Sequence, residues 1–184
     1  MFKSTRKIVI SGVMAAMLIT LGLLPQGFIP TIFGVSLTPM HVPVIIGAVL
    51  EGPVVGFVLG LIFGAFSFLQ AAIAPRGPGD VLFTNPVVSI LPRLFIGPVA
   101  WAVYELLRRI KEPLAMAAAG VAGSLTNTIL VLGVIGLLHL LPWTLIGGLA
   151  LTNGPVEAAV AAVLTLAVVA AVKHIETGRR GSTV

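Results

Sequence analysis

Six apolar stretches, separated by short polar breaks, fill this 184-residue chain, and its basic residues gather at alternate breaks. Nine of the eleven Lys and Arg residues form three clusters: before the first stretch, between the fourth and fifth, and after the sixth. With six spans, the three clusters share one face of a membrane, and excess Lys and Arg marks the cytoplasmic face. The clusters are Lys3, Arg6 and Lys7; Arg108, Arg109 and Lys111; and Lys173, Arg179 and Arg180. The pattern therefore predicts six transmembrane helices with both termini in the cytoplasm.

The composition indicates one all-α integral membrane domain. The chain is 58% hydrophobic and 9% charged, whereas a soluble domain carries about 25% charged residues. Its net charge of +5 follows from the positive-inside pattern. No basic surface studded with aromatic residues suggests nucleic-acid binding. The chain has no cysteine, which excludes disulfides and thiol chemistry.

The predicted spans differ in length. The second is short for a hydrocarbon core of about 30 Å, so we expect it to begin inside the preceding external loop or to pack tightly on its neighbours. The first follows a basic start but lacks an A-x-A cleavage site, which favours a retained helix over a signal peptide. The expected spans are 8–24, 39–50, 53–73, 86–107, 113–140 and 144–172, followed by a polar cytoplasmic tail at 173–184.

A stripe of glycines runs along the third span. Gly52, Gly56, Gly60 and Gly64 recur every four residues and so share one helix face. Such a face lets another backbone approach closely. We expect the partner to be another helix of this same chain.

Several polar residues fall where lipid is expected. Arg93 in the fourth span and Glu157 in the sixth lie at similar depths from the external side. A charge at the bilayer centre costs about 2.5–3.5 kcal/mol or more, so these two either form a structural ion pair or line a wet pocket. Asn153 lies one turn from Glu157, Asn127 is central in the fifth span, and His139 is near its external end. Both interpretations remain open from these residues alone.

No motif in the chain supplies an energy source or a catalytic centre. P-loop, HExxH and GxSxG motifs are absent, and the three histidines are too scattered for a metal site. We therefore expect no enzyme activity, no metal and no cofactor. A binding subunit that needs partners for active transport fits best. The alternatives are a stand-alone secondary carrier or channel, with Arg93 and Glu157 as a gating pair, and an intramembrane enzyme or assembly factor.

Four stretches, taken in order and spacing, carry a family resemblance. They are 37–43 (LTPMHVP), 52–56 (GPVVG), 91–93 (LPR) and 123–128 (GSLTNT). With six spans and a long first external loop, the chain resembles the substrate-binding S components of energy-coupling factor (ECF) vitamin transporters. The resemblance implies a vitamin ligand, a transmembrane coupling subunit and two cytoplasmic ATPases as partners.

In that family, small residues spaced four apart on the first helix dock the coupling subunit. The family pattern is Ala-x-x-x-Ala. Here Gly12 and Ala16 match it best, and Ser11 and Ala15 form a parallel register. Small residues permit tight helix crossing within a membrane.

The resemblance also places the ligand between the external halves of the later helices. The implied ligand-binding residues are Arg93, Asn127, Asn153, Glu157 and His139, with Phe28, Phe33, Phe83, Asn85 and Trp143 as lids. Few aromatic residues are available to stack on a flavin or a folate. Arg93 favours a carboxylate, so the substrate expected is a small acidic vitamin such as pantothenate, with lipoate or biotin as alternatives.

Overall fold

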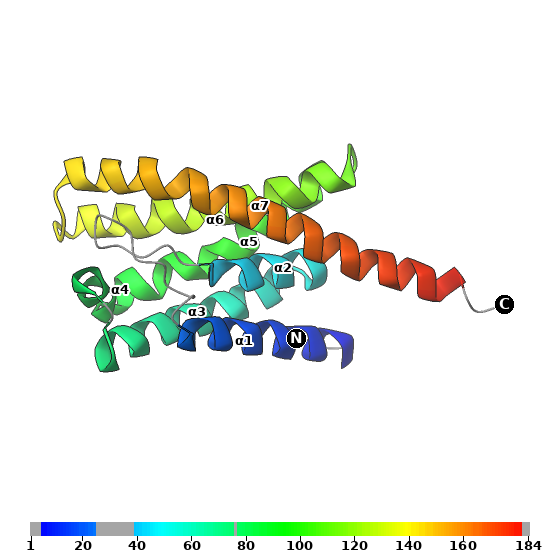
Figure 1. The fold of residues 1–184 in the computed structure, drawn as a ribbon, viewed down its shortest axis with the longest axis horizontal. Coiled ribbons are helices and arrows are strands. Elements are labelled where there is room, and N and C mark those ends of the chain that lie inside the picture. The colour runs from blue at the N-terminus through cyan, green and yellow to red at the C-terminus, as the bar shows by residue number, and fades with distance from the viewer. Residues whose placement is uncertain (1–4, 25–38, 76, 182–184) are drawn as a thin grey trace.

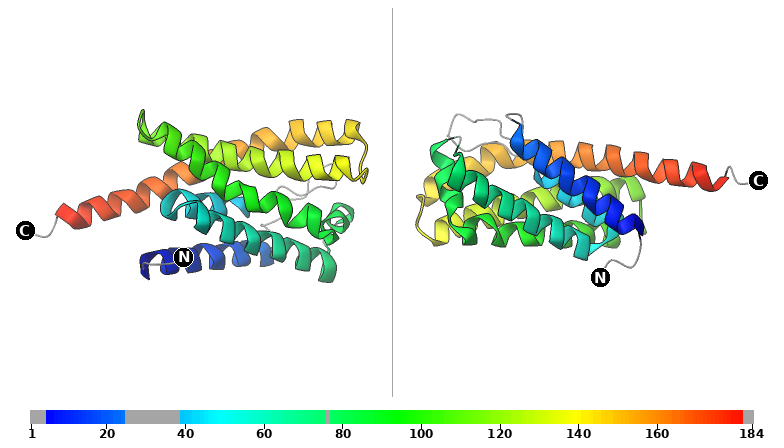
Figure 2. Two further views of the ribbon diagram at one scale, coloured as in Figure 1. Left: turned by 180° about the vertical axis from the view of Figure 1, so that it is seen from behind. Right: turned by 90° about the horizontal axis from the view of Figure 1, so that it is seen from below.

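The computed structural model describes residues 5–24, 39–75 and 77–181, which fold into a helical bundle (Figure 1; Figure 2). Every regular element in these ranges is helical, which confirms the all-α class. The elements are α1 (Thr5–Leu23), α2 (His41–Glu51), α3 (Pro53–Ile73), the 3₁₀ helix η2 (Pro78–Thr84), α4 (Pro86–Ser89), α5 (Leu91–Leu107), α6 (Glu112–Leu137) and α7 (Trp143–Gly181).

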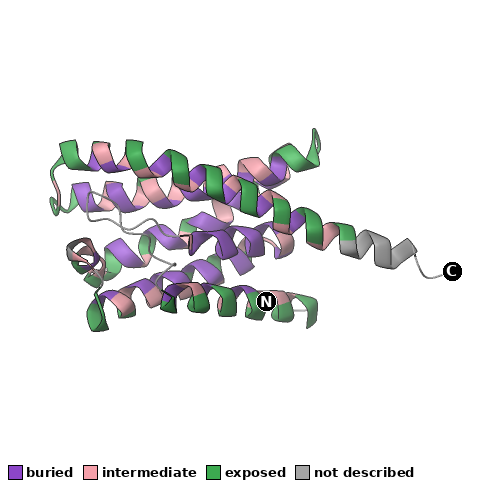
Figure 3. Ribbon diagram, viewed as in Figure 1, coloured by how far each residue is buried: buried purple, intermediate pink, exposed green. Residues whose placement is uncertain are grey.

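Five helical segments of the described ranges are long and apolar enough to cross a membrane. They are α1, α3, α4 with α5, α6, and α7 as far as His174. The remaining apolar stretch, which is the second along the chain and forms α2, has only 11 residues, or about 16 Å at 1.5 Å per residue. All of α2 except Leu50 is buried, and Figure 3 shows the helix coloured as buried over almost its whole length. This short helix therefore packs on its neighbours along its whole length.

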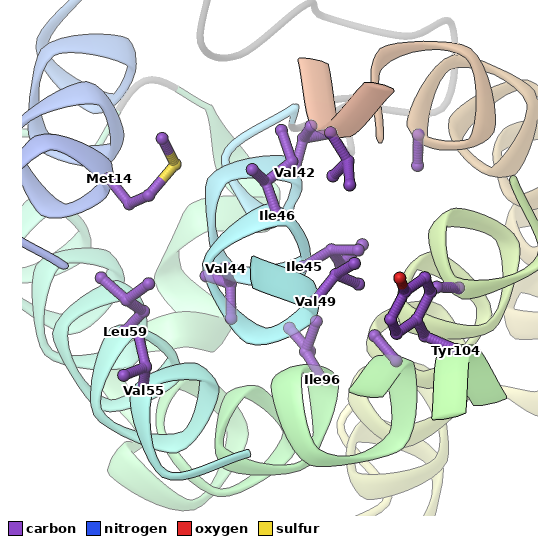
Figure 4. Packing of buried hydrophobic residues seen from close by; sticks show 14 of the residues in the cluster. Met14, Val42, Val44, Ile45, Ile46, Val49, Val55, Leu59, Ile96 and Tyr104 are labelled. Carbon is purple, nitrogen blue, oxygen red and sulfur yellow. The ribbon is translucent and has the colours of Figure 1, made fainter. Parts of the chain in front are cut away.

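The main hydrophobic core surrounds α2 (Figure 4). Ile45 and Ile46 of α2 are almost completely buried and belong to one cluster with Leu18 of α1, Ile96 of α5 and Tyr104. A second cluster joins α4, α6 and α7 in the other half of the bundle; it contains Val88, Val131, Leu132, Ile135, Ile146 and Leu149. The two clusters leave room between α3, α5, α6 and α7 for the cavity described below.

Local sequence explains where the helices begin and end. Gly52 adopts a φ of 101°, which is not helical and ends α2. Glycine suits this position because other residues rarely take such a conformation. Pro53 then starts α3. The expected span 86–107 is divided at Ile90 into α4 and α5, with Pro92 in the first turn of α5. The last helix continues to Gly181, past the expected end at 172.

The start of α1, the turn between α5 and α6, and the end of α7 lie together at what we name the basic end of the bundle (Figure 1). Arg6 of α1 forms an ion pair of 3.0 Å with Glu51 of α2. The Lys173 ammonium donates to the Tyr104 hydroxyl and to Glu112, and so joins α7 to α5 and α6. The opposite end, named the far end, contains η2, α4 and the turn between α6 and α7.

The glycine stripe packs α3 against α5. A Cβ at Gly56 would lie 2.7 Å from the Gly97 Cα, and one at Gly60 would lie 2.2 Å from the Arg93 carbonyl oxygen. A Cβ at Gly64 would lie 2.7 Å from the Ile90 Cα. The partner of these three glycines is thus a helix of the same chain, as predicted, whereas Gly52, the fourth glycine of the predicted stripe, precedes α3 and a Cβ there would meet nothing within 4 Å.

Candidate ligand-binding cavity

A cavity opens in the far half of the bundle, between α3, η2, α5, α6 and α7. The empty space inside it, together with the open space at its mouth, amounts to about 840 Å³. The lining residues are Phe63, Ser67, Gln70 and Ala71 of α3; Gly79, Asp80 and Phe83 of η2; Arg93; Asn127, Thr128, Val131 and Leu132 of α6; and Leu149, Asn153 and Glu157 of α7. Apolar walls with a few inward polar groups are typical of sites for small organic ligands.

Arg93 is the buried cation of this cavity, with 5% of its surface exposed. The rings of Phe63 and Phe83 lie 5.4 and 4.8 Å from its guanidinium carbon, which is within cation–π range. Its Nη1 donates to the Val88 carbonyl oxygen at 2.5 Å. Its buried Nε has no hydrogen-bond partner. The guanidinium is therefore fixed in orientation while one of its donors still lacks an acceptor.

Helix packing determines where Arg93 lies. Because Gly60 has no side chain, α3 approaches the Arg93 backbone closely enough that a Cβ would overlap its carbonyl oxygen. Phe63, about one turn further along α3, then reaches the guanidinium. The glycine stripe and the cation of the cavity thus belong to a single helix crossing.

Helices α6 and α7 supply the opposite wall. Asn127 is buried, with 8% of its surface exposed, and its Oδ1 has no hydrogen-bond partner. The Thr128 hydroxyl donates to Glu157 Oε2 at 3.3 Å and is also 3.2 Å from the Ser124 carbonyl oxygen. Glu157 attracts Arg93 electrostatically, although the guanidinium's own hydrogen bond goes to Val88. The two charges thus share the cavity.

Four of the five residues predicted to bind ligand line this cavity: Arg93, Asn127, Asn153 and Glu157. Phe83, predicted as a lid, lines it too. Phe28 and Phe33 lie outside the described residues.

Three other predicted residues have different surroundings at the far end. Asn85 caps α4, since its Oδ1 accepts a hydrogen bond from the Val87 amide at 3.0 Å. Trp143 starts α7, is 59% exposed, and lies against Gly136. His139 is exposed just beyond α6 with a φ of 56°. None of these three is among the residues that line the described cavity.

Four polar residues that line the cavity were not predicted from the sequence: Ser67, Gln70, Asp80 and Thr128. Ser67 and Gln70 follow Phe63 on α3 at spacings of four and three, which places all three on one helix face. This spacing could have identified the three residues as one face, but α3 was interpreted only from its glycine stripe, as a packing helix. Asp80 comes from η2, whose position depends on tertiary packing. Among the described residues, there is no group of three or more His, Cys, Asp or Glu side chains that could hold a metal ion.

Comparison with known proteins assigns the chain to a family. The model of the family described as "ECF transporter, substrate-specific component" matches residues 6–169. The chain is 34% identical over 158 residues to the pantothenic acid transporter PanT of Lactococcus lactis subsp. cremoris, covering 76% of this chain and 79% of that protein. It is 28% identical over 133 residues to the pantothenate transporter PanT of Leuconostoc mesenteroides, covering 68% of this chain and 65% of that protein. The chain is therefore a multi-pass membrane protein that belongs to the substrate-specific components of ECF transporters.

Proposed function

We propose that this chain is the pantothenate-binding subunit of an ATP-driven importer and that the cavity beside Arg93 holds the vitamin. The observation that carries the proposal is a buried guanidinium that lines an open cavity and has a donor without an acceptor. Two relatives are named as pantothenate transporters. A carboxylate is the group that an arginine edge binds best.

The chemistry of pantothenate supports this choice. The molecule has a carboxylate at one end, two hydroxyls at the other, an amide between them and a geminal dimethyl group. Arg93 offers a cation for the carboxylate, while Asn127 and Asn153 offer amides for the polar middle. Val131, Leu132 and the ring of Phe63 provide apolar surface for the methyl groups. A flat aromatic vitamin would use fewer of these groups.

The charge pattern supports an orientation in the membrane. Excess Lys and Arg marks the cytoplasmic side, and the described basic clusters lie at the basic end. We place both termini in the cytoplasm, with six spans that include the short α2. The cavity, in the far half, then opens toward the outside of the cell membrane.

Helix α1 is the proposed docking face for the coupling subunit, which in turn would connect to two ATPases. It has only three buried residues and lies on the side of α2 away from α6 and α7 (Figure 1). Gly12 and Ala16 are exposed, and a Cβ at Gly12 would meet nothing within 4 Å. Ala15 packs on the core and the Ser11 hydroxyl donates to the Lys7 carbonyl oxygen. The Gly12 register is therefore the one that a partner helix could reach.

Titration of the detergent-purified chain with pantothenate, biotin and lipoate tests the substrate. We expect pantothenate to bind without ATP or an ion gradient, and Arg93→Gln to weaken binding at least tenfold. Arg93→Lys is the matched control, since it keeps the charge but loses the planar fork. No pantothenate binding by the wild-type chain would refute the proposal, and uptake into vesicles by the chain alone would favour a stand-alone carrier.

A further inference from the structure

Two buried atoms in the cavity lack hydrogen-bond partners, and they have opposite character. Arg93 Nε is a donor, and Asn127 Oδ1 is an acceptor. Both side chains are more than nine-tenths buried, and both line the cavity. Native proteins satisfy nearly all buried polar atoms, and because these two belong to residues that line the cavity, a ligand there is placed to satisfy them.

The two atoms specify different ligand groups. An arginine N–H requires an acceptor, which a carboxylate supplies. The side-chain carbonyl of asparagine requires a donor, which a neutral hydroxyl or amide N–H supplies and an ionised carboxylate cannot. A ligand that satisfies both atoms must therefore carry an acceptor, for which a carboxylate suits the arginine best, and, separately, a neutral donor.

The packing around Asn127 increases its effect on selectivity. One turn earlier on α6, a Cβ at Gly123 would lie 2.5 Å from Ile45 Cγ1 and 3.3 Å from the Ala100 Cβ. Helix α6 is thus in close contact with α2 and α5 directly beside Asn127. A ligand atom that reaches Oδ1 leaves water behind, and polar contacts in desolvated surroundings discriminate most strongly.

We propose that Asn127 is a specificity-determining residue, which accepts a hydrogen bond from a hydroxyl or amide N–H of the ligand. It thereby selects acids that carry a neutral donor over acids that carry none. This inference rests on the proposed function, because pantothenate carries both groups. Lipoate has the carboxylate but no neutral donor, so it gains no hydrogen bond from Oδ1 and binds more weakly than an acid that carries a donor.

The test measures pantothenate and lipoate affinities for the wild-type, Asn127→Leu and Asn127→Thr chains, with lipoate measured by competition where it is weak. Leucine has the same number of side-chain heavy atoms and the same branching as asparagine and removes the acceptor, whereas threonine keeps a hydroxyl acceptor. We expect Asn127→Leu to weaken pantothenate binding about 10- to 100-fold while lipoate binding stays equal or becomes tighter. Asn127→Thr should retain more of the preference for pantothenate than Asn127→Leu.

A melting curve for each variant separates loss of fold from loss of binding, and if Asn127→Leu does not fold, the Asn127→Thr comparison decides. Equal changes for both ligands, or no change for either, would overturn the inference while leaving pantothenate as the substrate. If the wild-type chain binds no pantothenate, the proposed function fails by itself. The role of Asn127 is then tested with acids that carry no neutral donor. If the wild-type chain binds them more tightly than Asn127→Leu does, the inference is overturned. If Asn127→Leu binds them more tightly, the inference is supported.

Discussion

Replacing Gly60 with alanine should damage both stability and ligand binding, because one backbone contact supports both. The new Cβ would lie 2.2 Å from the Arg93 carbonyl oxygen and 3.0 Å from its carbonyl carbon. Favourable contacts between carbon and a carbonyl oxygen are about 3.3–3.6 Å. Helices α3 and α5 must therefore separate locally by about 1 Å, and Arg93 moves with α5.

The size of the effect follows from two opposing contributions. Overpacking typically costs about 1–3 kcal/mol, and a clash with backbone rather than a flexible side chain belongs at the upper end. Alanine restores about 1 kcal/mol of helix propensity relative to glycine. We therefore expect a net loss of about 2 kcal/mol in the free energy of unfolding, or roughly 4–8 °C in melting temperature for a chain of this size. Pantothenate affinity should fall at least tenfold, since site geometry tolerates shifts of only about 0.5 Å.

The assay is thermal melting in detergent together with pantothenate titration, and Gly133→Ala on α6 is the matched control. A Cβ at Gly133 would meet nothing within 4 Å, so this variant should gain stability from helix propensity alone and keep its affinity. Identical melting and affinity for Gly60→Ala and Gly133→Ala would refute the contact argument. Weakened binding by a Gly60→Ala chain of unchanged stability would show that displacement of Arg93, rather than unfolding, is responsible.

Three further changes test other parts of the molecule. Gly12→Leu should prevent assembly with the coupling subunit in a pull-down while leaving pantothenate affinity intact; joint loss of both would remove the docking assignment. Glu157→Gln should melt lower than the double variant Arg93→Met with Glu157→Gln, because a lone buried charge is worse than none; equal melting would mean that the two charges are not coupled. Glu112→Gln should cost at most about 1 kcal/mol in chemical unfolding, since a half-exposed pair with Lys173 is screened by solvent and salt; a much larger loss would contradict this.

The helices could be predicted from the sequence because their signals are local. Apolar length gave the long spans, and Gly52 with Pro53 marked the turn between α2 and α3. The division of the fourth apolar stretch at Ile90 was not predicted, because proline is common within membrane helices and its effect depends on neighbouring helices.

The polar residues near the cavity divide in the same way. Arg93 and Glu157 stand out in sequence because a charge in an apolar helix requires a reason. Asn85 and Trp143 were predicted to cover the ligand because they lie at the external ends of the spans. In the structure both side chains make local contacts instead: Asn85 caps α4 and Trp143 packs on Gly136. Position along a span shows depth in the membrane, but which residues converge depends on how the helices cross.

The crossing of α3 and α5 links the two strongest sequence features of this chain. From the sequence alone, the glycine stripe predicts helix packing and the arginine in an apolar span predicts a functional site, and nothing connects the two. In the bundle, Gly60 brings α3 against the Arg93 backbone, and Phe63 on the next turn covers the guanidinium. A membrane gives little hydrophobic drive for helices to associate, so close backbone contact must position them. The same contact therefore holds the arginine at the cavity.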